Sequence, residues 1–116
     1  MSELDAALQR LRGHDGVDHL ILLGRDGLVV QHLGGDGKEE PVAARVPGLA
    51  NACSALGTAA GTGRFQTAVV EFDSGVAIIA ALSGDLLLVA MVRAGIGFAP
   101  LLRELRRERS QLVELL

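Results

Sequence analysis

Aromatic and cysteine residues are scarce in this 116-residue sequence, and each scarcity excludes a class of site. Tryptophan and tyrosine are absent and phenylalanine occurs 3 times, so platforms that stack nucleic-acid bases on aromatic side chains are not expected. The single cysteine, Cys53, excludes an internal disulfide and a metal site of several cysteines, and is typical of a reducing compartment. Because the formal net charge is -3, a concentrated basic surface for nucleic acid or anionic membranes is not expected either.

Long hydrophobic runs are also missing. Residues 68–92 are strongly apolar, but Glu71 and two turn-forming stretches at 73–75 and 83–85 interrupt them. No piece approaches the roughly 20 apolar residues of a membrane span. The N-terminal stretch MSELDAALQRL is acidic and amphipathic, whereas a secretory signal is basic and then continuously apolar. We therefore expect a cytoplasmic protein with no membrane span and, at this length, a single domain over residues 1–116.

What is present is an alternation of helix-like and strand-like periodicity. Apolar residues at helical spacing predict a short helix over 2–12 with Ser2 as its N-cap, a long helix ending near 60, and a closing helix from about 97. Apolar runs of strand length cover 17–23, 27–33, 65–72, 76–82 and 86–92. The predicted order is α-β-β-α-β-β-β-α, which belongs to the α+β class.

The connections between the predicted strands indicate how the sheet is built. The turns at 24–27, 73–75 and 83–85 are too short for anything but antiparallel neighbours. The strands at 76–82 and 86–92 are apolar on both faces, so helices must cover both sides of the sheet. The simplest layout pairs the first strand with the last, which leaves 27–33 and 65–72 at the edges of a five-stranded antiparallel sheet.

The long helix has a core stripe that is predicted from spacings of three and four residues. The stripe consists of Val42, Val46, Leu49, Cys53, Leu56 and Ala60. The polar stretch 34–41 before it is predicted to be a solvated loop. Pro41 suits a first turn, but Pro47 would remove a helical hydrogen bond, so the helix either begins near Pro47 or kinks there.

The predicted edge strand at 65–72 indicates self-association. It carries one charge, Glu71, and no proline, lysine or glycine to protect an edge. Pairing with its own copy across a two-fold axis would cover it. The long helix has a line of small residues that would let a second helix approach closely, although alanine also simply favours helix. We therefore expect a homodimer whose interface contains Phe65, Gln66, Thr67, Val69, Glu71, Ala52, Ala55 and Ala59.

The order of elements resembles a known family when it is taken with three further features. These are a first hairpin that continues as Arg25-Asp26-Gly27-Leu28-Val29-Val30, a central helix rich in small residues, and a closing three-strand meander. Over essentially the whole chain they resemble the roadblock/dynein light chain family, and within it the bacterial Mgl-type regulators of Ras-like GTPases. The resemblance implies a roadblock (profilin-like) sandwich and a homodimer with a shared ten-stranded sheet.

The same resemblance implies a partner and an activity. A Ras-like small GTPase would bind the surface that includes the paired central helices, where Asn51, Ser54, Thr58 and Arg45 lie. Mgl-type members act as GTPase-activating proteins by rearranging the GTPase's own catalytic residues, without an inserted arginine finger. A passive dimeric scaffold that recruits a GTPase or another complex without changing any rate is the alternative.

Motifs for independent catalysis are weak. Residues 57–63 are rich in glycine but lack the Lys-Ser/Thr of a phosphate loop, so a helix stop is the better interpretation. His14, His19 and His32 do not have a metal-ligand spacing, although His19 and His32 could oppose each other across the first hairpin. We expect no catalytic residues, no metal, no cofactor and no enzymatic activity of the chain alone. Arg25 and Arg64 are the exposed candidates for an arginine finger, but no neighbour in the sequence is predicted to hold either in place.

Overall fold

The computed structural model describes residues 2–83 and 85–116. It contains three helices and a five-stranded antiparallel sheet in the order β2-β1-β5-β4-β3. Along the chain the elements are α1 (Glu3–Arg12), β1 (Val17–Gly24), β2 (Val29–Gly34), α2 (Glu39–Ala60), β3 (Thr67–Phe72), β4 (Gly75–Ala81), β5 (Leu86–Arg93) and α3 (Ala99–Leu115). The predicted order of elements, the pairing of the first strand with the last, and both edge strands are confirmed. Gly84 of the predicted turn at 83–85 lies outside the described residues.

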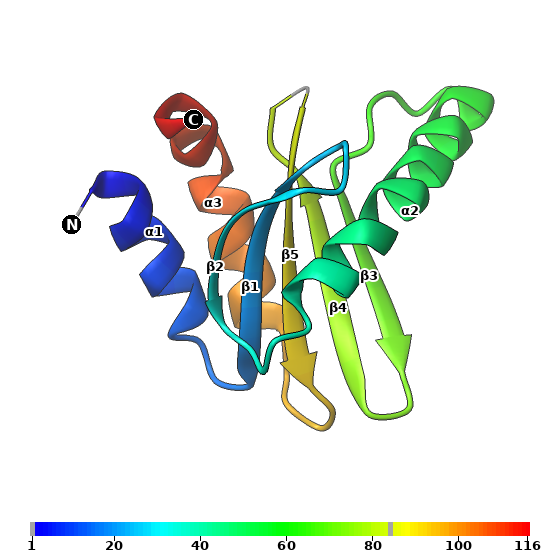
Figure 1. Ribbon diagram of the computed structural model, residues 1–116. Helices are drawn as coiled ribbons and strands as arrows, with labels where there is room; N and C mark the ends of the chain where they lie inside the picture. The colour runs from blue at the N-terminus through cyan, green and yellow to red at the C-terminus, as the bar shows by residue number, and fades with distance from the viewer. Residues whose placement is uncertain (1, 84) are drawn as a thin grey trace.

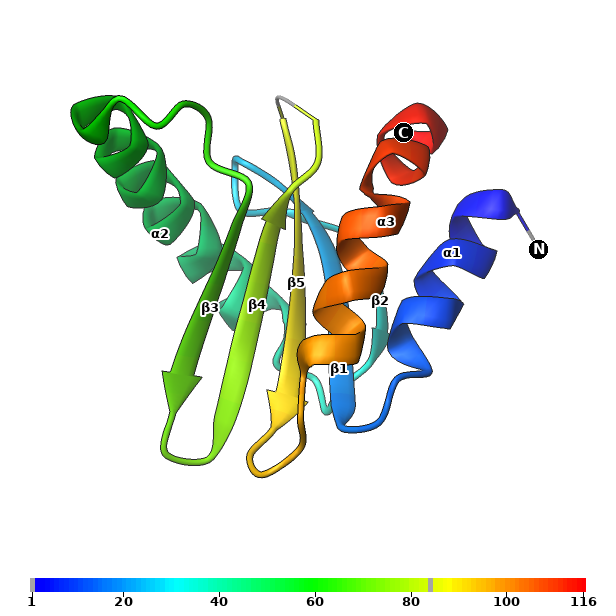
Figure 2. The ribbon, with the colours of Figure 1, turned by 180° about the vertical axis from the view of Figure 1, so that it is seen from behind.

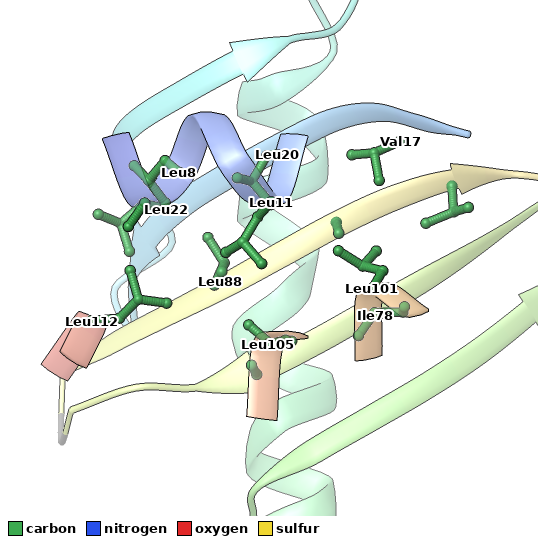
Figure 3. Packing of buried hydrophobic residues seen from close by; sticks show 14 of the residues in the cluster. Leu8, Leu11, Val17, Leu20, Leu22, Ile78, Leu88, Leu101, Leu105 and Leu112 are labelled. Carbon is green, nitrogen blue, oxygen red and sulfur yellow. The ribbon is translucent and has the colours of Figure 1, made fainter. Parts of the chain in front are cut away.

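The sheet separates two apolar cores, as strands with two apolar faces require. One face packs against α1 and α3 and the other against α2 (Figure 1). Leu11 of α1 and Leu112 of α3 are both fully buried on the first face. Figure 3 shows the leucines of α1 and α3 directed at Leu20, Leu22 and Leu88 of the sheet. Among the described residues, no helix has the length and apolarity needed to cross a membrane.

The first hairpin turns on local chemistry, as predicted. Gly27 has a φ of 84°, which glycine adopts without strain. Its backbone N–H donates to the Gly24 carbonyl at 2.9 Å. The Asp26 side chain accepts a hydrogen bond from the Leu28 backbone N–H at 3.0 Å. The Arg-Asp-Gly step therefore sets the reversal of the chain between β1 and β2.

The start of α2 differs from the prediction. The helix begins at Glu39 and continues through Pro47, so the end of the predicted loop 34–41 is helical and Pro47 does not start the helix. Glu39 and Glu40 place negative charge in the first turn, where the helix dipole favours it, and Pro41 lies where no hydrogen bond is lost. Pro47 removes one helical hydrogen bond, but it does not end the helix.

The charged face of the closing helix α3 is not all solvated. Glu108 pairs with Arg10 at 3.1 Å and Glu104 contacts His14 at 2.6 Å, so both acids join α3 to the α1 region. The Arg109 guanidinium donates to the backbone carbonyl of Gln66 at 2.7 Å and to that of Ala81. Burial lowers the pKa of Arg109 below its usual range. This arginine anchors α3 to the segment that leads into β3.

Candidate protein-docking surface

Helix α2 is anchored to the sheet only by its first half. Its buried residues are Ala43, Val46 and Ala50. The predicted stripe holds only in part, because Cys53 is half-buried but Leu49 is 39% and Leu56 is 69% exposed. Figures 1 and 2 show the C-terminal end of α2 standing away from the sheet. The apolar spacing therefore continues into a segment that nothing in the described chain covers.

The residues predicted for the dimer and for the GTPase lie on this uncovered segment and just before it. Ala52, Ala55 and Ala59 are exposed on α2. Asn51, Thr58 and Arg45 are also exposed, while Ser54 is half-buried. Most of the residues predicted for the dimer and for the GTPase are therefore exposed on the same helix. That helix can lie against another backbone or another protein.

The β3 edge carries only part of the predicted interface. Val69 and Glu71 are exposed, and Thr67 is half-buried. Phe65 and Gln66 precede the strand, which begins at Thr67. The Phe65 side chain packs against the core beneath α2, and the Gln66 carbonyl accepts hydrogen bonds from Arg109 and from the Ala81 backbone N–H. Phe65 is therefore half-buried against this core, and the placement of residues 65 and 66 within the edge strand was wrong.

An apolar groove of about 460 Å³ lies between α2 and the sheet. Its lining includes Leu49, Val70, Phe72 and Met91, with Lys38 and Arg45 as basic residues. Phe72 is 59% exposed at the end of β3. The sequence does not predict this groove. Because side chains alternate between the two faces of a strand, the sequence predicts that Val70 and Phe72 share a face of β3. That this face is not covered by α2 depends on the tilt of the helix.

The two finger candidates lie at the opposite end of α2. Arg25 and Arg64 line one hollow together with Ser54 and Thr58. Arg25 Nη1 donates to Asn51 Oδ1 at 3.4 Å, so Arg25 has the neighbour that the sequence did not predict. The contact is long and exposed.

The glycine-rich stretch 57–63 ends α2, as predicted. Gly61 caps the helix in the left-handed conformation with a φ of 69°. Its backbone N–H donates to the Thr58 carbonyl at 3.2 Å, and that of Thr62 donates to the Gly57 carbonyl at 3.0 Å. These amides bond to the helix's own carbonyls, so they do not form the anion cradle of a phosphate loop.

The first hairpin places two histidines beside α2. The rings of His19 on β1 and His32 on β2 lie 5.4 Å apart, edge to face. Glu39 of α2 approaches His32, with 3.5 Å between Nε2 and Oε1. Desolvation lowers the pKa of His19, and the neighbouring His32 lowers it further. The sequence spacing of the histidines predicts no metal site, and the fold brings Glu39, seven residues beyond His32, close to both rings.

Comparisons with known proteins agree with this architecture. The structure of the gliding protein MglB from Thermus thermophilus superposes with a TM-score of 0.85 at 20% identity, over 97% of this chain and 87% of that chain. MglB from Myxococcus xanthus gives 0.86 at 14% identity, over 99% and 95%. A Roadblock/LC7 domain from Streptomyces avermitilis gives 0.75 at 25% identity, over 98% of each chain.

Sequence comparison gives the family. A search of curated proteins found no significant match. The model of the Roadblock/LC7 domain matches residues 3–91. That match includes the first hairpin, the exposed helix α2 and the β3 edge, and extends into β5. With the family model covering most of its length, the chain belongs to the Roadblock/LC7 domain family.

Proposed function

We propose that this protein is a regulatory homodimer that binds a Ras-like small GTPase and stimulates GTP hydrolysis indirectly. The observation that carries the proposal is the uncovered C-terminal half of α2 beside an uncovered β3 edge. Leu56 is exposed on α2, and Val69 and Phe72 are exposed on β3. Large exposed apolar side chains on a helix and on an edge strand are typical of protein-interaction surfaces.

The edge and the helix support a two-fold dimer. Antiparallel pairing of β3 with its copy would satisfy the open edge and give a ten-stranded sheet. The same axis would bring two α2 helices together on one face. Exposed Ala52, Ala55 and Ala59 allow close approach, because their side chains are small. Leu56 and Phe72 would then be covered by the second copy.

The GTPase would bind the outer surface of the paired helices through Asn51, Thr58 and Arg45, which are exposed, and through Ser54. A finger mechanism requires a guanidinium that extends toward the phosphates in the transition state. Arg25 instead contacts Asn51 on its own chain. This contact favours activation through the GTPase's own catalytic residues.

The experiment mixes the protein with a Ras-like GTPase encoded beside its gene and follows phosphate release. We expect faster release with the wild type, and equal stimulation by the Arg25→Ala and Arg64→Ala variants. Loss of stimulation in either arginine variant, with binding intact, would establish a finger. If the GTPase binds but its rate is unchanged, the protein is a passive scaffold.

A matched pair of substitutions tests the surface itself. Asn51→Arg should weaken GTPase binding, since it places a long charged side chain in the middle of the proposed contact. Gln111→Arg makes a similar change at an exposed position of α3, on the other face of the sheet, and should leave binding unchanged. Equal binding by both variants, measured by calorimetry, would refute the assignment to α2.

A further inference from the structure

Three potential metal ligands converge where the first hairpin meets the start of α2. One ring nitrogen of His19, one of His32 and a carboxylate oxygen of Glu39 all lie within 4.8 Å of one another. They come from β1, β2 and the first turn of α2 respectively. The cluster lies at the opposite end of α2 from the exposed segment that carries Leu56.

Two atoms of this cluster are buried without a hydrogen-bond partner in the described part of the chain. His19 is 4% exposed and its Nε2 has no partner. Glu39 Oε2 is likewise buried and without a partner. Buried polar atoms are nearly always satisfied in folded proteins, and an unplaced ion is one of the few explanations when they are not. Two such atoms in one three-residue cluster point to a missing ligand.

We infer that His19, His32 and Glu39 bind a divalent transition-metal ion of the Zn²⁺ type. Imidazole nitrogen suits zinc, copper and nickel, whereas calcium and magnesium require oxygen ligands. Two histidines and one glutamate are a known zinc ligand set, with a fourth position left open for water or another donor. The half-buried Glu39 carboxylate supplies negative charge that partly balances the ion.

The geometry permits binding after a small contraction. Zinc bonds of about 2.0–2.2 Å bring tetrahedral ligand atoms to roughly 3.5 Å from one another, the separation already found between His32 Nε2 and Glu39 Oε1. The wider separations in the cluster must close by about an ångström. The His32 side chain is 40% and the Glu39 side chain 22% exposed, and residues 35–38 connect their elements outside any helix or strand. Both side chains can therefore move toward His19.

Charges of both signs lie near the cluster. Asp36 favours a cation near His19 and Arg12 opposes one. Lys38 is held by Asp36 at 3.3 Å. Two of the three ligands are imidazoles, and this ligand set favours transition metals over hard cations.

A metal at this position would clamp the start of α2 to the first hairpin. Few contacts in the monomer hold α2 beyond its first half, so its direction depends on how its N-terminal turn is fixed. The metal would tie that turn to the inner strand β1 and to the edge strand β2. The inference goes beyond the proposed GTPase regulation and does not depend on it.

Titration of the EDTA-treated full chain with ZnCl₂ tests the site. Calorimetry should give one Zn²⁺ per chain, and Tm should rise by roughly 10 °C at about 100 times the Kd. His32→Ala and Glu39→Gln should each lower the affinity at least about 10- to 100-fold, the loss that even outer-shell changes cause. His14→Ala is the matched control, because His14 lies on the other side of the sheet against Glu104. It should bind Zn²⁺ like the wild type.

Three results would overturn the inference: no Zn²⁺ binding by the wild type, equal affinity in His32→Ala and wild type, or an equal loss in His14→Ala. X-ray absorption of the Zn²⁺-loaded wild type gives a readout independent of any variant's folding. Two imidazoles and one carboxylate should appear in its ligand shell. A shell without imidazole would exclude the site.

Discussion

Replacing Val69 with lysine tests whether β3 is the edge that pairs two copies of this chain. Val69 is 38% exposed in the single chain. Complete burial of a valine contributes about 1.5–3 kcal/mol, so covering the rest contributes about 1 kcal/mol per copy. A lysine there also leaves a charge at the interface, at a cost on the order of 2 kcal/mol for each copy. The two copies together lose about 5–6 kcal/mol, which raises the dimer Kd roughly 10³- to 10⁴-fold.

The assay is sedimentation equilibrium over a concentration series. The matched control is Val30→Lys, the same substitution on the opposite edge strand β2, where the side chain is 60% exposed. We expect Val69→Lys to be monomeric at concentrations where the wild type and Val30→Lys are dimeric. Circular dichroism and urea unfolding establish that both variants fold. A Val69→Lys dimer of wild-type affinity, or dissociation caused by Val30→Lys instead, would refute the β3 interface.

Three further changes test the core, the surface of α2 and the α1 cap. Leu88→Ala should lower the free energy of unfolding by about 2–5 kcal/mol, because Leu88 is buried in the central strand β5; an unchanged urea midpoint would contradict that packing. In the Val69→Lys background, Leu56→Asp should change the free energy of unfolding by less than about 0.5 kcal/mol, since the side chain is 69% exposed; a larger loss would mean that the monomer already covers it. The Gln31 hydrogen bond holds the pKa of Asp5 below 3.8, so the stabilisation is present above pH 3.8 and disappears as the pH falls through the folded-state pKa. Asp5→Asn should therefore flatten the dependence of the urea midpoint on pH below about 4, and an acid slope like that of the wild type would count against this linkage.

Much of the sheet could be predicted because its signals are local. The turn between β1 and β2 follows from two glycines and the Asp26 side chain, which determine the reversal within four residues. The two-sided apolar character of β4 required helices on both faces. The positions of the strands in the sheet follow from the same pattern. A strand that is apolar on both faces lies inside the sheet, whereas β3 is not completely covered and lies at an edge.

The surface of α2 could be predicted only in part. Apolar residues spaced three and four positions apart indicate which residues share a face of a helix, but not what that face contacts. Leu56 and Val46 look equivalent in sequence, yet Val46 is 6% and Leu56 is 69% exposed. The difference arises from the angle between α2 and the sheet, which depends on packing at Ala43 and Ala50.

The sequence by itself determined the order of elements, the turns, the capping of α1 by Ser2 and the pairing of β1 with β5, because each depends on residues close in the chain or on the polarity of a whole strand. Only the tertiary structure shows which half of α2 is covered. It also shows that Phe65 packs against the core and that Arg109 anchors α3 to the segment that leads into β3. It also brought Glu39 to His19 and His32. These contacts join residues of different elements. The spacing of apolar residues along the chain does not indicate how far apart those elements lie in space.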